Sequence, residues 1–160
     1  MKIRQATIKD LNAMVDLINM YAEKGMMLPR SKLSLCETLP CFVVVEDPQD
    51  PQRVIGVGGL HILWEDLAEI RSLVIAPDYA GKGIGKLLVE HLCGRARDLE
   101  IQRVMALTYQ EKFFINCGFH IVEKESLPHK VWKDCINCSK FPACDEIALI
   151  KEVIPVSVSV

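Results

Sequence analysis

The sequence predicts an α+β fold built on a mixed β-sheet. Strand patterns outnumber helix patterns, and the strands at 41–46 and 54–64 flank a turn, which indicates a hairpin. A strand at 69–75 then leads through one helix to a strand at 104–107, which is a crossover between parallel strands. A hairpin pairs strands antiparallel and a crossover pairs them parallel, so the sheet should contain both kinds of neighbour.

The first elements follow from local patterns. Residues 2–5 alternate polar and apolar as a short strand, and Thr7 with Asp10 resembles a capping box that opens a helix. Helical spacing continues to Gly25, and a second short helix is expected after position 31. The apolar positions of the first helix are Leu11, Met14, Val15, Ile18, Tyr21 and Ala22.

The second half alternates strands and helices. A strongly amphipathic helix begins near residue 84, and a short helix is expected at 110–117. Strands are expected at 119–123 and 147–150. The apolar side of the amphipathic helix should consist of Ile84, Leu87, Leu88, Leu92, Ala96 and Leu99.

Length and charge limit the functional class. The chain has 160 residues, is 50% hydrophobic and carries a formal net charge of −2. We expect one domain over 1–153, a flexible tail at 154–160, and no nucleic-acid or membrane partner, because basic residues form no patch. The N-terminus lacks the apolar run of a signal peptide, which predicts a cytoplasmic protein with a small-molecule ligand. A homodimer is compatible with the sequence.

A glycine-rich loop is the most informative segment. Gly81, Gly83 and Gly85 alternate with other residues between a strand and the amphipathic helix. Glycines at a helix start bring backbone N–H groups close to an anion, which predicts a phosphate site. A P-loop would need glycine at Ala80 and Ser or Thr at Leu87, and a dinucleotide fingerprint would need glycine at 86. Both nucleotide interpretations are therefore disfavoured.

The loop resembles instead the pyrophosphate loop of GNAT acyl-CoA N-acyltransferases, and the segments at 73–79 and 113–119 extend the resemblance. It implies a mixed sheet of about six to seven strands flanked by about four helices. It also implies acetyl-CoA as acetyl donor. Ala80 departs from the family pattern, which has Gln or Arg there, so CoA should bind more weakly, with Lys82 and Lys86 as partial substitutes. The implied cofactor-binding residues are Leu73, Val74, Gly81, Lys82, Gly83, Ile84, Gly85 and Lys86.

Acetyl transfer needs a group that removes a proton from the attacking amine. Glu69 is the candidate base, because Glu69, Arg71 and Leu73 alternate along one strand and should share a face. The alternative is a solvent-facing carboxylate. GNAT enzymes often carry a tyrosine as general acid where this chain has Phe114, and Tyr109 does not match that position. The acid is therefore unassigned.

Within the family, the chain resembles the short bacterial N-acetylglutamate synthases in segments 25–31, 68–73 and 127–134. This resemblance implies direct transfer to the α-amine of L-glutamate, the first step of arginine biosynthesis. Regulation through the amino-acid-kinase domain of longer synthases is not expected. The alternatives are an acetyltransferase for another small amine or a protein N-terminus, and a non-catalytic acyl-CoA sensor. The cations that could match two carboxylates are Arg30, Arg71, Lys130 and Lys133.

The seven cysteines are read as reduced thiols, because the number is odd and no export signal precedes them. Cys135, Cys138 and Cys144 could bind zinc together with His129, but the spacing lacks a second C-x-x-C, so reduced thiols are favoured. The remaining cysteines lie in apolar patterns and are expected in the core; they are Cys36, Cys41, Cys93 and Cys117.

Overall fold

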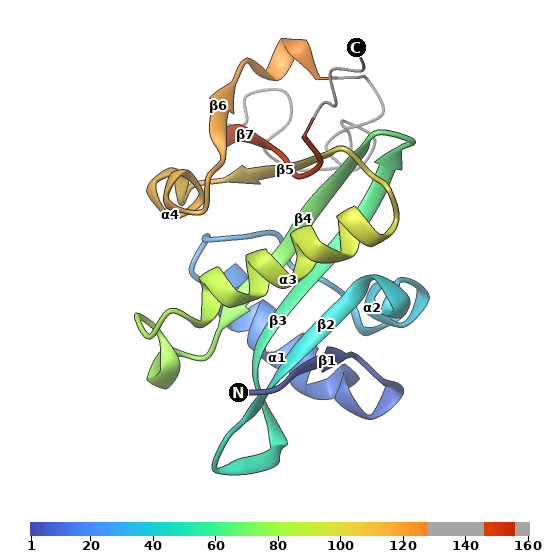
Figure 1. Ribbon diagram of the computed structural model, residues 1–160. Helices are drawn as coiled ribbons and strands as arrows, with labels where there is room; N and C mark the ends of the chain where they lie inside the picture. The colour runs from blue at the N-terminus through green and yellow to red at the C-terminus, as the bar shows by residue number, and fades with distance from the viewer. Residues whose placement is uncertain (128–145, 156–160) are drawn as a thin grey trace. The chain divides into compact units, whose positions relative to one another are not determined.

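The computed structural model describes residues 1–127 and 146–155, and these form two compact units (Figure 1). The first unit comprises 1–60 and 70–92, and the second comprises 61–69 and the chain from 93. The elements are β1 (Ile3–Gln5), α1 (Leu11–Glu23), α2 (Lys32–Glu37), β2 (Phe42–Asp47), β3 (Asp50–Trp64), β4 (Leu67–Ile75), α3 (Ile84–Asp98), β5 (Arg103–Thr108), α4 (Glu111–Asn116), β6 (His120–Val122) and β7 (Ile147–Glu152).

The described strands form one seven-stranded mixed sheet in the order β1-β2-β3-β4-β5-β7-β6. The predicted hairpin is β2–β3, and the predicted crossover is the parallel pair β4 and β5 with α3 between them in the chain. The α+β prediction with a mixed sheet is confirmed. One domain over 1–153 stays a prediction, and the tail predicted at 154–160 lies mostly outside the described residues.

Close packing of β2, β3 and α3 characterises the first unit. Phe42 to Val45 are all buried in β2, and α1 buries Leu11, Met14, Leu17 and Ile18. A β-carbon on Gly58 would lie 3.1 Å from side-chain atoms of both Leu73 and Leu92. A side chain at position 58 would therefore have to displace these leucines, and glycine lets α3 pack closely on this face of the sheet. Asp47 pairs with Asp50, so the hairpin turn is shorter than predicted.

The second unit is built around β5. Residues 67–69 of β4 pair parallel with β5, whose other edge pairs antiparallel with β7, and β6 pairs antiparallel with β7. Inward-facing residues of these strands form a cluster with the segment after β6. Its buried members are Leu67, Met105, Leu127, Ala148 and Ile150.

Some residues predicted to lie in the core are exposed. Leu87 and Leu99, predicted on the apolar side of α3, are both exposed, because Leu87 faces solvent from the first turns and Leu99 follows the end of the helix. Cys36 is exposed and Cys41 half-buried, whereas Cys93 and Cys117 are buried as predicted. None of the described helices is long and apolar enough to cross a membrane.

The predicted capping box forms before α1. Asp10 accepts hydrogen bonds from the Thr7 backbone N–H at 2.7 Å and from the Arg4 guanidinium at 2.8 and 2.9 Å. The Arg4 hydrogen bonds, followed by that from Thr7, hold the pKa of Asp10 below its usual value of 3.8, against the opposing effect of burial. Asp10 therefore joins β1 to the start of α1 through a buried carboxylate.

Asp10→Asn should lower the free energy of unfolding by about 1.5–3 kcal/mol at pH 7, because a charged acceptor is lost. A carboxyl with a lowered folded-state pKa stabilises the fold above its unfolded pKa, and this contribution disappears as pH falls through the folded pKa. Urea unfolding at pH 7 and at pH 3 checks this. The difference between wild type and variant should narrow at the lower pH, and a constant difference would contradict the ionic role.

Candidate functional site

Gly81 and Gly83 lie between α3 and the short turn η3 (Pro77–Tyr79), which follows β4, whereas Gly85 lies within the first turn of α3. Gly81 and Gly83 have φ angles of 77° and 83°, in the left-handed region that glycine adopts without strain. A β-carbon at either position would meet no atom of the protein within 4 Å. The backbone of this loop is therefore open to a ligand on the side where side chains would otherwise project.

The start of α3 adds to this site. The helix begins at Ile84, directly after Gly83, and continues for 15 residues. Its first-turn N–H groups have no acceptor within the helix, and the helix dipole places partial positive charge there. Lys82 and Lys86 are exposed on either side of this start. Such an arrangement suits a pyrophosphate, the anion that the resemblance implies.

Leu73 and Val74, the predicted pantetheine contacts, lie in the first-unit part of β4. The Leu73 side chain faces the position of Gly58, and Val74 is buried. Ser72, just before them, has a φ of 55°, which is unusual for a residue with a side chain. The strict alternation expected from Glu69 through Arg71 to Leu73 is thus interrupted between the last two. A shared face for all three does not follow from strand spacing.

Glu69, the predicted base, lies in the second unit. It is buried, with 6% of its surface exposed, and pairs with Met105 of β5. The alternative of a solvent-facing carboxylate is therefore wrong. Glu69 is thus one of three buried acidic residues in the described chain, with Asp10 and Asp47, and a buried carboxylate is costly unless it has polar partners.

Of the four predicted substrate-binding cations, the structure describes Arg30 and Arg71. Arg30 and Arg71 are both half-buried in the first unit. The Asn19 side chain pairs with the Arg30 backbone, accepting from its N–H and donating to its carbonyl, both at 3.1 Å. The Arg30 guanidinium donates to the Ser34 hydroxyl at 3.3 Å. Asn19 thus holds the chain between α1 and α2 at Arg30.

Several predicted groups lie outside the described residues. Lys130 and Lys133 are among them, as are the candidate zinc ligands Cys135, Cys138 and Cys144 with His129. In residues 1–127 and 146–155, no group of His, Cys, Asp and Glu side chains is arranged to hold a metal ion.

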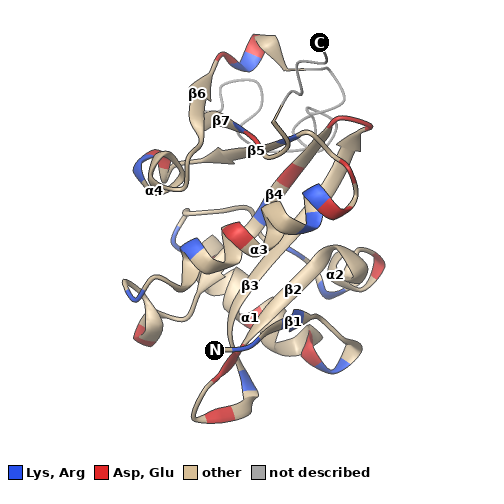
Figure 2. Ribbon diagram, viewed as in Figure 1, with Lys and Arg blue, Asp and Glu red and all other residues tan. Residues whose placement is uncertain are grey.

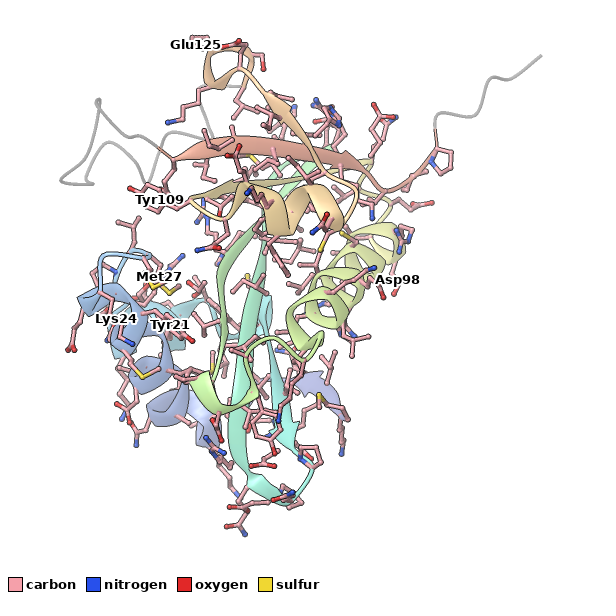
Figure 3. The ribbon with its side chains drawn as sticks, turned by 90° about the vertical axis from the view of Figure 1, so that its left-hand side faces the viewer. Tyr21, Lys24, Met27, Asp98, Tyr109 and Glu125 are labelled. Carbon is pink, nitrogen blue, oxygen red and sulfur yellow. The ribbon has the colours of Figure 1, made fainter. Side chains whose placement is uncertain are left out.

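Phe114 has a structural role. It is buried between Phe113 and Phe119, with ring centroids 5.1 and 5.2 Å away in edge-to-face contacts. Tyr109, labelled in Figure 3, follows β5 and precedes α4, and is half-buried. The residue at the family's usual acid position is therefore a core residue here, and the acid stays unassigned.

The sequence analysis did not predict the side-chain contacts of Asn19 and Tyr79. Asn19 pairs with a segment eleven residues away, and Tyr79, next to the glycine loop, donates its hydroxyl to Asp47, 32 residues away. Asn19 carried no signal beyond its place near the end of a helix pattern. The position of Tyr79 beside the loop was a usable signal.

The chain is similar in sequence to known proteins. The model of the acetyltransferase (GNAT) family matches residues 12–120. An uncharacterized N-acetyltransferase of Chlorobaculum tepidum is 38% identical over 93% of this chain and 94% of its own. An amino-acid acetyltransferase of Mycobacterium tuberculosis is 37% identical over 82% of this chain and 75% of its own. A Shewanella oneidensis amino-acid acetyltransferase is 33% identical, but the match spans only 29% of that longer protein.

Solved structures of two proteins have a similar fold. A Mycobacterium tuberculosis protein in complex with CoA and NLQ superimposes with a TM-score of 0.84 and 30% identity, covering 96% of this chain and 100% of that one. N-acetylglutamate synthase of Neisseria gonorrhoeae, complexed with CoA and N-acetyl-glutamate, gives 0.86 and 26%, covering 96% of this chain and 35% of that one. With the glycine loop before α3 and a family match over most of its length, the chain belongs to the GNAT acetyltransferase family.

Proposed function

We propose that this acetyltransferase transfers the acetyl group of acetyl-CoA to the α-amine of L-glutamate, directly between two bound substrates. The observation that carries the proposal is similarity over 82% of the chain to an amino-acid acetyltransferase, and over 96% of it to a synthase solved with CoA and N-acetyl-glutamate. In a cell the reaction would supply N-acetylglutamate for arginine biosynthesis, in the cytoplasm.

The glycine loop and α3 would hold the pyrophosphate of acetyl-CoA on backbone amides of 81–86, with backbone groups of Leu73 and Val74 along the pantetheine. Left-handed φ angles at Gly81 and Gly83 and the uncrowded space beside both support this role. The loss of the side-chain donor at Ala80 affects affinity more than geometry, because most contacts of such a loop come from the backbone.

Glu69 would be the general base. The α-amine of an amino acid is mostly protonated at neutral pH, since even the α-amine of a peptide has a pKa of about 8. Glu69 would take one proton, directly or through one water, before the neutral nitrogen attacks the thioester carbonyl. The carbon–nitrogen bond then forms and the carbon–sulfur bond breaks, CoA leaves as a thiolate, and the second amine proton passes through water to that thiolate.

Arg30 and Arg71 would bind the substrate carboxylates, together with Lys130 and Lys133. Glutamate offers two carboxylates, and guanidinium groups suit paired hydrogen bonds to them. The Asn19 contact with the Arg30 backbone supports this assignment, because it limits where the Arg30 side chain can reach. A neutral amide in place of the side-chain carboxylate would leave a desolvated cation unpaired.

Steady-state thiol release from acetyl-CoA, measured across amino acids and amines, tests the proposal. L-glutamate should exceed L-glutamine in kcat/KM by more than about tenfold, because an unpaired buried charge discriminates more strongly than size. Arg71→Leu should raise the KM for glutamate. Equal use of glutamine or of a polyamine would favour another acetyltransferase function, and CoA binding without turnover would favour the sensor alternative.

A further inference from the structure

Charged and aromatic side chains of the first unit connect the β2–β3 hairpin to the turn that precedes the glycine loop. Acidic and basic residues lie at both places (Figure 2). Asp47 and Arg53 come from the hairpin, and Asp78 and Tyr79 from η3. Tyr79 is two residues before Gly81, so whatever holds Tyr79 also limits where the loop begins.

Asp47 is the buried member of this cluster, with 7% of its side chain exposed. It accepts a hydrogen bond from the Tyr79 hydroxyl at 2.6 Å, from the Gln49 backbone N–H at 2.9 Å and from the Arg53 guanidinium at 3.1 Å. The hydrogen bond with Tyr79 is the main reason that the pKa of Asp47 lies below, and that of Tyr79 above, its usual value. The Asp47 carboxylate thus holds Tyr79 in one orientation.

Arg53 joins the same two segments. Its guanidinium donates to both oxygens of Asp78 at 2.8 and 2.9 Å, and its carbon centre lies 5.9 Å from the Tyr79 ring centroid. Arg53 and Asp78 are exposed, so this ion pair contributes little to stability. Its paired geometry nevertheless restricts how η3 can move relative to the hairpin.

The Tyr79 ring in turn holds a cation of the loop. The Lys82 ammonium lies 4.9 Å from the ring centroid, a cation–π distance, and Lys82 stands between Gly81 and Gly83. Glycines at both sides leave this lysine on a backbone with little intrinsic stiffness. The contact therefore places a positive charge within the loop, next to the position where Ala80 supplies no side-chain donor.

We propose that Asp47 and Tyr79 are positioning residues for the pyrophosphate of acetyl-CoA, with Asp47 fixing Tyr79 and the Tyr79 ring fixing Lys82. The inference rests on the proposed role of the loop as the acetyl-CoA site. A loop held in its binding conformation loses less entropy when the ligand arrives, so the cluster strengthens cofactor binding without touching the acetyl group or the amine.

Calorimetric titration with CoA and steady-state kinetics of the whole chain test the inference. Tyr79→Phe keeps the ring and removes the anchor, and Asp47→Asn removes the charge that anchors it. Each should raise the Kd for CoA roughly 3- to 10-fold. The kcat at saturating acetyl-CoA and the KM for the amine should not change. The double variant should be little weaker than either single one, because both remove the same contact.

Asp10→Asn is the matched control. Asp10 is also buried and also accepts from an arginine and a backbone N–H, but it lies at the start of α1. It should lose stability and keep the wild-type Kd. An unchanged Kd in Tyr79→Phe, or an equal rise in Asp10→Asn, would overturn the inference. A wild type that binds CoA but acetylates no amino acid would overturn only the proposed function, and one that binds no CoA would overturn both.

Discussion

Gly83→Val should abolish measurable binding of acetyl-CoA in a chain that still folds. Gly83 has a φ of 83°, and a β-branched residue in that region costs about 1–3 kcal/mol or moves the backbone elsewhere. A β-carbon there would meet no protein atom within 4 Å, so the protein itself leaves room for it. The loss should come from the changed loop and from side-chain atoms standing where the pyrophosphate approaches.

Gly25→Val separates strain from ligand contact. Gly25 follows α1 with a φ of 72° and is equally uncrowded. Its variant should lose comparable stability, measured by thermal unfolding, while CoA titrates as in wild type. Wild-type CoA affinity in a folded Gly83→Val protein would remove the glycine loop from the cofactor site.

Glu69→Gln should lower kcat at pH 7 by about 10²- to 10⁴-fold, the usual contribution of a positioned base. CoA affinity should stay close to wild type, because Glu69 is assigned to the amine. The deficit should shrink as pH rises and free amine becomes abundant. A pH–rate profile from pH 6 to pH 10, with acetyl-CoA and amine saturating, measures both effects.

Glu65→Gln is the control for this variant. Glu65 is exposed and lies between β3 and β4, a short distance along the chain from Glu69. The Glu65→Gln variant loses the same charge, but Glu65 has no role in proton transfer. The kcat of this variant should therefore equal that of wild type. Full activity of Glu69→Gln at pH 7 would remove Glu69 from the mechanism.

The α-helices and strands of the described residues could be predicted from the sequence, because apolar spacing, caps and turns are local. Gly25 follows the end of α1, and Asp10 accepts the Thr7 N–H just before its start, as the patterns indicate. The place of β7 between β5 and β6 could not be predicted, since strand order depends on tertiary pairing. The left-handed φ of Ser72 was equally inaccessible, because serine has no strong local preference for it.

The candidate site, like the fold, has features that could be predicted from the sequence and features that could not. The glycine loop was predictable because glycine positions reflect backbone requirements, whereas the hydrogen bond between Tyr79 and Asp47 joins residues 32 apart in the chain. Burial of Glu69 also depends on the pairing of β4 with β5, and its strand spacing alone left a solvent-facing position open. Contacts between single side chains far apart in the chain cannot be predicted from local sequence patterns.

Identifying the acetylated product shows directly whether this protein acetylates L-glutamate. The whole chain is incubated with acetyl-CoA and an equimolar mixture of L-glutamate, L-glutamine, L-aspartate, spermidine and a short peptide, and acetylated products are quantified by mass spectrometry. We predict N-acetyl-L-glutamate as the main product, formed in step with thiol release. A mixture dominated by acetylated spermidine or peptide, or CoA binding with no acetylated product, would exclude L-glutamate as the acceptor.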